Sequence, residues 1–402
     1  MMMPALVLSA CLAAATAATA ATAAAPRPSQ QRARNPLPEG PILAGYANWG
    51  QCDEGLVQAA RDGLNVLLWF SINLAIDEAT GEPTITGPAA TGPAFYDCVA
   101  GVVAQIEAEN LQVAHLVSIG GWNSPHPASE FGGAEFFAAW KKWNEDEVAR
   151  PEVGWLGFSG FDWDIEGNDD PESQHNVFTM ATLRTMGDMS VLAKQEGYVV
   201  AMAPAQSYLD CTTAEFSRSV AFPPHEPWQG DFFYHGRNTY AFLLAEYGSD
   251  TFDFISIQLY EGYSSANWAI SENAVSPSDY LEEFVECVLA GWEVDFQSVP
   301  ETGLPRSSVN ITRAQLVVGL ANGWAAPPPN KFLLLWPEDI GSAYRALRER
   351  SDEPRGFMFW NIADEGEVVL GTERELWLTR ELRSEMGLGR APGVAASGGS
   401  QQ

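Results

Sequence analysis

Three carboxylic acids stand at alternating positions in one short apolar segment of the chain. Asp162, Asp164 and Glu166 are separated by Trp163 and Ile165. Because alternate residues of a β-strand point to the same face, a strand would aim all three acids into one interior. Like charges in such an interior disfavour joint ionisation, so one acid keeps its proton near neutral pH. This spacing therefore indicates general acid catalysis by a carboxyl group.

Two other interpretations of the acidic segment are weaker. A solvated turn would explain residues 168–170, but the apolar residues between the three acids demand a buried environment. A calcium loop of the EF-hand type needs a glutamate at its twelfth position, where this chain has Ser173, and the preceding segment resembles a strand rather than a helix. We therefore expect no bound metal here.

Other catalytic classes fit the sequence poorly. The five histidines include no close pair with the spacing of a zinc site. Ser118 lacks the glycine two positions earlier that a nucleophile elbow requires. We expect neither a metal nor another cofactor.

Eight short apolar segments have the character of strands, and segments of helical periodicity lie between them. This alternation predicts an α/β protein with a parallel sheet, and eight strands with a final helix predict a closed (β/α)8 TIM barrel. A doubly wound sheet is the alternative, but no Gly-x-Gly-x-x-Gly follows the first strand. The predicted strands begin at Ile42, Asn65, Val113, Gly160, Tyr198, Phe252, Gln315 and Gly356, and helices at Ala94, Phe178, Asp279, Glu338 and Leu376.

The barrel prediction also places the acids. Active sites of such barrels lie at the carboxyl ends of the strands, and Glu166 is the acid nearest to that end of its strand. The seventh strand is expected from Gln315 and the eighth from Gly356, which leaves no room for a large subdomain between them. We expect a single catalytic domain.

The acidic segment resembles the signature of the family 18 glycoside hydrolases, the chitinases and their relatives. Four weaker motifs of that family accompany it in the family's order, over almost all of residues 41–388. These motifs correspond here to Ser118–Gly121, Met202–Pro204, Gln258–Tyr260 and Trp360. One departure is Ser159, where the family usually has an aspartate whose role is mainly structural.

The resemblance implies hydrolysis assisted by the substrate's own 2-acetamido group, with retention of configuration. Glu166 would protonate the glycosidic oxygen and later serve as the base for water. Asp164 would orient the acetamido N–H, while Asp162 would hold a hydrogen bond to Asp164. Tyr260 would steady the acetamido oxygen. No carboxylate nucleophile is needed.

Further residues are expected to contact the sugar. Trp360 is the predicted platform, because a flat aromatic face stacks on pyranose C–H groups, although core packing is the alternative. Gln258 would contact the sugar or fill the barrel, and Met202 has packing as the stronger alternative. Tyr46 stands at a strand end, from which it could line the site or belong to the core.

The two ends of the chain differ in composition from its centre. Residues 1–25 are small and apolar, end in an Ala-x-Ala pattern, and are typical of a signal peptide, although they lack an initial lysine or arginine. Residues 26–40 are predicted to be a proline-rich linker, residues 41–388 the glycoside hydrolase domain, and residues 389–402 a flexible tail. A leader without an export role is the alternative for residues 1–25.

Four cysteines remain after the leader, an even number that suggests disulfides in an exported protein. Three pairings are possible. Proximity along the chain favours Cys52 with Cys98, which leaves Cys211 with Cys287. The expected position of Cys287 inside a helix argues against the second pair.

The overall charge limits the choice of partner. The chain carries 52 acidic and 22 basic residues, a formal net charge of -30. Nucleic acids and anionic membrane surfaces attract basic patches, so neither is an expected partner. A neutral polysaccharide is compatible with this charge.

The sequence thus predicts a secreted, monomeric chitinase that acts on chitin or oligosaccharides containing N-acetylglucosamine. Two alternatives stay open. One is an endo-β-N-acetylglucosaminidase acting on N-glycan cores with the same acids. The other is an inactive chitin-binding lectin or inhibitor, which the presence of Glu166 disfavours.

Overall fold

A computed structural model describes residues 35–220, 234–325 and 332–388. The expected signal peptide and the expected tail both lie outside the described residues, so these two predictions stay untested. No described helix combines the length and the apolar character that crossing a membrane would require.

Eight parallel strands form a closed barrel. β1 pairs with both β11 and β2, and the order between them runs β11, β10, β7, β6, β5, β4 and β2. Each of the eight strands overlaps a segment that the sequence predicts as a strand, so the barrel prediction is confirmed. The barrel strands are β1 (Ile42–Ala47), β2 (Val66–Ile76), β4 (Ala114–Gly121), β5 (Gly160–Ile165), β6 (Val199–Met202), β7 (Phe254–Gln258), β10 (Leu316–Ala321) and β11 (Gly356–Trp360).

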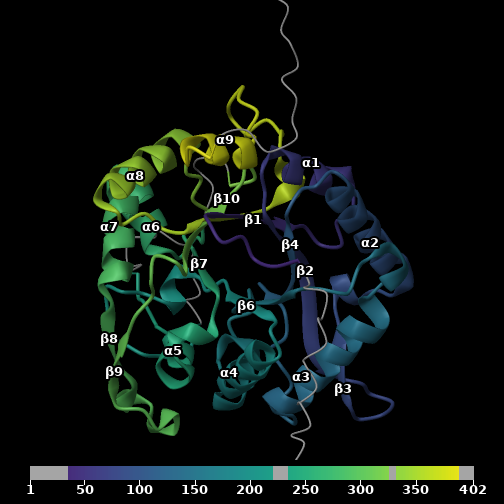
Figure 1. Ribbon diagram of the computed structural model, residues 1–402. Coiled ribbons are helices and arrows are strands. Elements are labelled where there is room, and N and C mark those ends of the chain that lie inside the picture. Colours follow the sequence, from purple (N-terminus) through teal and green to yellow (C-terminus); the bar gives the residue numbers. More distant parts are fainter. Residues whose placement is uncertain (1–34, 221–233, 326–331, 389–402) are drawn as a thin grey trace, which may run out of the picture. The chain divides into compact units, whose positions relative to one another are not determined.

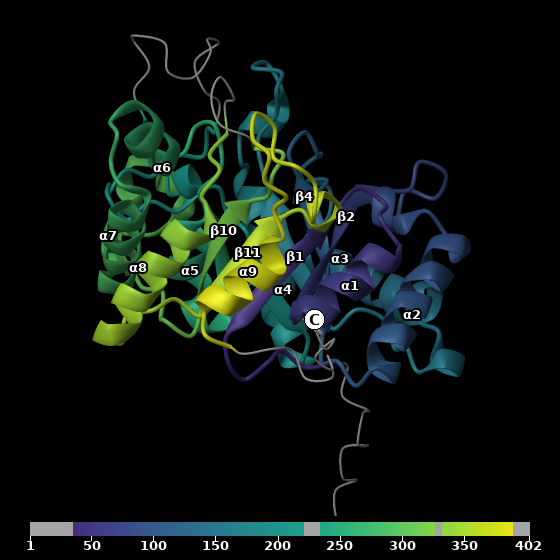
Figure 2. The same cartoon turned by 90° about the horizontal axis from the view of Figure 1, so that it is seen from above.

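Helices surround the strands, and α9 packs against both α8 and α1, so that the end of the chain completes the ring (Figures 1 and 2). Between β10 and β11 the described residues contain α8 and no subdomain, as expected. The helices are α1 (Glu54–Asp62), α2 (Pro93–Ala108), α3 (Gly133–Lys142), α4 (Met180–Gln195), α5 (Ala241–Tyr247), the short α6 (Ser265–Asn267), α7 (Pro277–Ala290), α8 (Pro337–Arg350) and α9 (Leu378–Glu385).

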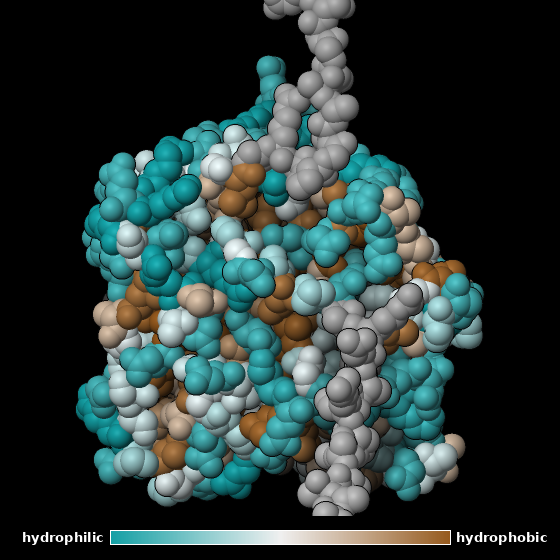
Figure 3. Space-filling view, in the orientation of Figure 1, coloured by the Kyte–Doolittle hydropathy of each residue, from teal (hydrophilic) through white to brown (hydrophobic). Residues whose placement is uncertain are grey.

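Two antiparallel additions were not predicted from the sequence. β3 (Pro83–Thr86) pairs with the far end of β2, and β8 (Trp292–Asp295) pairs with β9 (Arg306–Val309) beside the barrel. β3, β8 and β9 have four residues each and are partly exposed, so they carry no strong apolar pattern. On the face drawn in Figure 3, hydrophobic residues are scattered in small groups among hydrophilic ones.

The core has two layers separated by the strands. Along β5, Phe161 and Trp163 point outward into the layer between strands and helices, while the acids between them point into the barrel. The lower interior is filled by apolar side chains such as Leu68, Leu116 and Met358. The interior is therefore a packed core that closes the barrel beneath the acids.

The end of the expected linker is part of the barrel's packing. Leu37 packs against the interior cluster of the barrel. The side chains of Ser159 and Arg355 donate hydrogen bonds to the carbonyl oxygens of Asn35 and Pro38, at 2.9 and 2.7 Å. The end of the predicted linker therefore contacts the amino-terminal end of the barrel.

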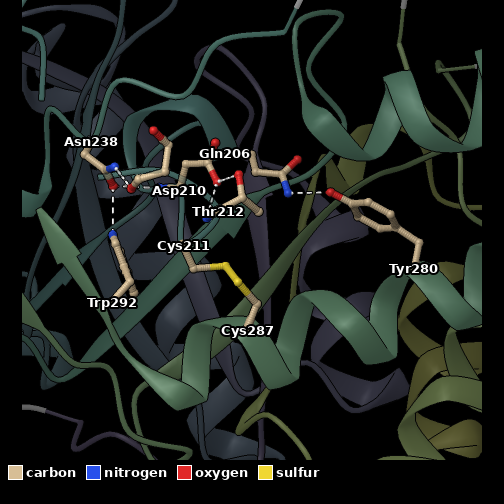
Figure 4. The surroundings of a disulfide bond; sticks show 9 residues. Gln206, Asp210, Cys211, Thr212, Asn238, Tyr280, Cys287 and Trp292 are labelled. Atoms are coloured by element: carbon tan, nitrogen blue, oxygen red, sulfur yellow. Dashed lines mark hydrogen bonds between the residues drawn. A yellow bond between two sulfur atoms is a disulfide. The ribbon is translucent and has the colours of Figure 1, made fainter. Parts of the chain in front are cut away.

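Both disulfides of the favoured pairing are present. Cys52 and Cys98 have Cα atoms 6.2 Å apart, and Cys211 and Cys287 have Cα atoms 5.9 Å apart. Cys287 does lie inside α7, but its side chain faces the loop after β6, so the helix does not prevent pairing (Figure 4).

The same loop and helix share a second contact beside that disulfide. The side-chain amide of Gln206 donates a hydrogen bond to the hydroxyl of Tyr280 in α7, at 2.7 Å (Figure 4). The disulfide and this hydrogen bond fix the loop after β6 against α7.

His115 is a fully buried histidine on the outer face of β4. Its Nδ1 accepts a hydrogen bond from the indole N–H of Trp69, at 3.3 Å, and its Nε2 has no partner among the described residues. Burial lowers the pKa of His115 from 6.5 to about 3. Protonation would also turn Nδ1 from an acceptor into a donor facing the donor of Trp69.

We predict that His115 makes the fold less stable in acid. Between pH 6.5 and 3 the unfolded chain binds a proton that the folded chain does not, so stability falls as the pH falls through this range. The loss at pH 4.5 should be about 3 kcal/mol. The measurement is the free energy of unfolding in urea at pH 7 and at pH 4.5. The decrease between these two pH values should be smaller in His115→Gln than in the wild type, by about that amount.

The exposed His235 provides the matched control, since His235→Gln should keep the acid sensitivity of the wild type. If the His115 variant loses stability in parallel with the wild type, then the histidine is not the cause.

Candidate active site

The three acids lie together at the carboxyl end of β5, as predicted. Asp162 and Asp164 belong to the strand and Glu166 follows it directly. Their side chains are almost fully buried, with 0, 4 and 5% of the residue surface exposed. The order along the strand places Glu166 nearest to the opening of the barrel.

Each acid has a different hydrogen-bond environment. The hydroxyl of Tyr46 donates to Oδ2 of Asp162 at 2.5 Å, and the amide of Gln258 donates to Oδ1 of Asp164 at 2.8 Å. Asp164 also shares a hydrogen bond with Glu166. Oε2 of Glu166 is buried and has no hydrogen-bond partner among the described residues.

One expected contact is absent among these described side chains. The expectation was a hydrogen bond between Asp162 and Asp164, but Asp162 is bonded to Tyr46 and Asp164 to Glu166 and Gln258. Asp164 therefore faces the opening of the barrel, toward Glu166, rather than the interior below it.

Burial and mutual repulsion keep these acids protonated to higher pH than usual. Burial raises the pKa of Asp162 to about 7, against the opposing effect of the Tyr46 hydrogen bond. Burial, and then the charge of Asp164, raise the pKa of Glu166 well above its usual value. Burial likewise raises the pKa of Asp164 well above its usual value, so this hydrogen-bonded pair keeps a proton to higher pH than a free carboxyl would.

Glu261 is a fourth carboxylic acid of the site, which the sequence interpretation missed. It follows Tyr260 just after β7, and burial raises its pKa to about 7. Its negative charge raises the pKa values of both Asp164 and Glu166. The only available signal was its position beside a recognised motif.

Tyr260 is at the site, and its phenol stays protonated. Burial raises its pKa well above 10, and the charges of Glu261 and Asp164 act in the same direction. With 7% of its surface exposed, it can present a hydroxyl donor at the opening of the barrel.

Three side chains that the sequence interpretation missed fix the backbone around Glu166. The hydroxyl of Tyr240 donates to the carbonyl oxygen of Ile165 at 2.9 Å, and the hydroxyl of Tyr208 accepts from the amide of Gly167 at 3.2 Å. A ring nitrogen of His126 lies 2.8 Å from the carbonyl oxygen of Glu166 itself. The backbone around Glu166 is therefore held by three side chains that lie far apart in sequence.

Aromatic rings form the wall beside the acids. Trp360 lies 5.4 Å from Tyr46 and 4.6 Å from Phe70, between ring centroids. Its carbonyl oxygen accepts a hydrogen bond from the indole N–H of Trp324 at 2.7 Å. Trp360 is partly exposed, and it lies against Tyr46, the other aromatic residue that the sequence suggested for the site.

Gly121, at the end of β4, makes room for this wall. It has φ +105°, and a Cβ atom there would lie 2.1 Å from the ring of Phe70. A side chain at this position would push Phe70 against Trp360. The second glycine of the recognised motif thus has a steric role.

Two predicted substrate contacts have other surroundings. Met202 is fully buried in the outer core, on the same face of the sheet as Trp163, so we do not include it in the site. Gln258 is 1% exposed and donates to both Asp164 and the carbonyl oxygen of Ala203. Gln258 therefore orients Asp164, and it has little surface left for a sugar.

Ser159 lies before β5, at the opposite end of the strand from Glu166. Its hydroxyl donates to the carbonyl oxygen of Asn35 and to none of the acids. Its departure from the family pattern therefore affects the closed end of the barrel. No group of three His, Cys, Asp or Glu side chains among the described residues is arranged to hold a metal ion.

Comparisons with known proteins agree on the fold. The sequence matches no protein-family model and no curated protein. The structure is similar to the C-terminal domain of ChiA from Legionella pneumophila, with a TM-score of 0.53 and 13% identity over 86% of this chain and 97% of that one. It is also similar to a fungal endo-β-N-acetylglucosaminidase of glycosyl hydrolase family 18, with a TM-score of 0.51 and 15% identity over 87% of this chain and 99% of that one. The chain has the fold of the family 18 glycoside hydrolases.

We predict that Glu261 sets the upper pH limit of the reaction that this site supports. Replacing it with Gln removes a negative charge, so the pKa of Glu166 falls and the acid loses its proton at lower pH. The alkaline limb of the kcat/KM profile should therefore move to lower pH.

Glu246→Gln makes the same change in net charge at an exposed position of α5, and it should leave the pH profile unchanged. An unmoved alkaline limb in Glu261→Gln would show that Glu261 does not act on the acid.

Proposed function

We propose that this protein is a secreted chitinase-type glycoside hydrolase. The observation that carries the proposal is the buried, hydrogen-bonded Asp164–Glu166 pair at the opening of the barrel, whose pKa values are both raised. A protonated carboxyl with an unpartnered oxygen is what glycosidic bond cleavage requires of a general acid. The two disulfides support an exported protein, because such bonds persist in oxidising compartments.

In the first step, Glu166 gives its proton to the glycosidic oxygen, and the C–O bond to the leaving sugar breaks. The carbonyl oxygen of the substrate's 2-acetamido group attacks the anomeric carbon and forms an oxazolinium ion. Asp164 accepts a hydrogen bond from the acetamido N–H and offsets the positive charge that develops. Gln258 holds Asp164 in position for this contact.

In the second step, Glu166 takes a proton from water as the water attacks the anomeric carbon. The oxazolinium ring opens, and the product keeps the configuration of the substrate. The hydroxyl of Tyr260 donates to the acetamido oxygen, and the ring of Trp360 supports the sugar. Asp162, held by Tyr46, adds negative charge beneath Asp164.

An endo-β-N-acetylglucosaminidase is the second candidate function. The similarity to the fungal enzyme of that activity covers nearly all of its chain and has a TM-score above 0.5. That reaction would use the same acids, because the N-glycan core also carries a 2-acetamido group at the cleaved sugar. An inactive lectin is the third reading, and the intact acids argue against it.

We predict that Glu166→Gln folds and binds sugar but loses turnover by roughly 10²- to 10⁴-fold, since only the transferable proton is removed. The measurement is hydrolysis of chitin oligosaccharides beside a chitobiose-core N-glycan, with the wild type and the variant in parallel. Cleavage of the oligosaccharides alone supports the chitinase, and cleavage of the N-glycan alone supports the endoglycosidase. Binding without any cleavage by the wild type would support the lectin, and undiminished hydrolysis by the variant would falsify the assignment of Glu166.

We predict a separate defect for Asp164→Asn. An amide cannot offset the positive charge of the intermediate, so kcat should fall by roughly 10²-fold or more while KM changes little. The exposed Asp250→Asn serves as the control, with wild-type kinetics expected. A mild effect on kcat would mean that the acetamido group is handled by another residue.

A further inference from the structure

A cavity lies between α1 and the segment that follows β11. It has a volume of about 450 Å³. Residues of the β1–α1 loop and of α1 line one side, including Trp49 and Gln58. Glu365 and Trp377 line the other side. None of the three acids of the site lines this cavity.

The lining combines aromatic rings, amides and carboxylates. Trp49 is 50% exposed, an unusual exposure for so large an apolar side chain, and Trp377 is partly exposed. The guanidinium of Arg380 lies 3.9 Å from the ring centroid of Trp377 and is paired with Asp62 at 3.0 Å. Arg380 and Asp62 therefore hold the ring of Trp377 in place. The amides of the lining belong to Asn48, Gln51 and Gln58, and its carboxylates to Asp53, Asp62 and Glu365.

Glu365 supplies an unused polar group to this cavity. Its Oε1 accepts hydrogen bonds from the backbone amide and the hydroxyl of Thr379, both at 3.0 Å. Its Oε2 is buried without a hydrogen-bond partner among the described residues. Such an atom carries a free-energy cost unless a ligand or water satisfies it. Burial also raises the pKa of Glu365 to about 7, so near neutral pH its carboxyl can either donate or accept.

The chemistry of the lining selects a class of ligand. No lysine or arginine is among the lining residues, and their charged groups are carboxylates, so an anionic ligand is disfavoured. The described residues offer no cluster that could hold a metal ion. Aromatic faces with amides and carboxyls fit a neutral polyhydroxylated chain, whose C–H faces stack on rings and whose hydroxyls bond to the polar groups.

The cavity is linked to the active site by packed rings. Trp49 packs edge-on against Phe70, with centroids 4.4 Å apart, and Phe70 packs edge-on against Trp360 at 4.6 Å. The ring of Trp49 therefore links the wall of the cavity to Phe70 and Trp360.

We propose that this cavity is an accessory binding site for a polysaccharide containing N-acetylglucosamine. The proposal rests on the proposed function, since it takes the substrate class from there. Its role is to hold an insoluble polymer against the enzyme, while the acids at the barrel opening act on one of its bonds.

The test uses two changes in the cavity and a matched control. Gln58→Arg fills the cavity from α1, and Trp377→Ala removes an aromatic wall, with the melting temperature of each variant checked. Gln195→Arg makes the same substitution at an exposed position of α4. Calorimetric titration with the hexamer of N-acetylglucosamine is done in the Glu166→Gln background, where the ligand is not consumed.

We expect two binding events in the Glu166→Gln protein and in its Gln195→Arg form, and one event after either cavity change. With Glu166 intact, the cavity variants should hydrolyse the trimer within twofold of the wild type. They should hydrolyse insoluble chitin several-fold more slowly.

A failure of this proposal differs from a failure of the proposed function. The accessory site alone is overturned by three results together. The trimer is hydrolysed normally, the Glu166→Gln protein shows a single binding event, and neither cavity change alters the hydrolysis of insoluble chitin. The absence of both hydrolysis and binding of these oligosaccharides by the wild type overturns the two together.

Discussion

The structure depends on burying several carboxylic acids at one end of a barrel whose interior is otherwise apolar. Asp162, Asp164 and Glu166 share a single strand, and Glu261 adds a fourth charge from β7. Their combined ionisation is costly, because each charge loses its hydration and repels the others. The molecule reduces this cost by keeping protons rather than by supplying cations, since the hydrogen-bond donors to these acids are Tyr46 and Gln258, both uncharged. Because these carboxyl groups stay protonated, a general acid is available at neutral pH.

Holding a reactive acid in one place requires the surrounding framework to be rigid. The backbone on either side of Glu166 is bonded to Tyr240, Tyr208 and His126, which come from three separate loops or helix starts. Beside it, the ring of Phe70 fills the space that Gly121 leaves and supports Trp360. The loop that carries Tyr208 is itself fixed to α7 by the Cys211–Cys287 disulfide. Several elements of the barrel thus help to fix the position of Glu166.

The sequence predicts the barrel well because every barrel strand is a short apolar run between helical segments. It misses β3 and the β8–β9 hairpin, whose strands are short and half polar. The acids are found because their alternation is itself a structural signal. Met202 was expected to face the interior of the barrel, but it pairs in register with Trp163 and therefore faces outward. The small residues Ala201 and Ala203, on either side of it, occupy the inward positions.

The residues that sequence reasoning missed share a different property. Glu261, Tyr208, Tyr240 and His126 reach the site from loops or helix starts, where periodicity carries no information about direction. Their roles arise only when the barrel closes and brings distant segments to one opening. A single sequence can therefore locate the strand that bears the chemistry, whereas the groups that tune and hold it are visible only in three dimensions.

The large negative charge of the chain is consistent with this arrangement. A formal charge of -30 disfavours ionisation of any further carboxyl, which acts in the same direction as burial on the pKa of Glu166. A neutral polysaccharide is not repelled by this field, and the positively charged intermediate of the proposed reaction is favoured by it. The charged groups that line the proposed accessory cavity have the same sign, and they disfavour an anionic ligand there as well. Charge therefore disfavours an anion at both places and does not penalise a neutral chain.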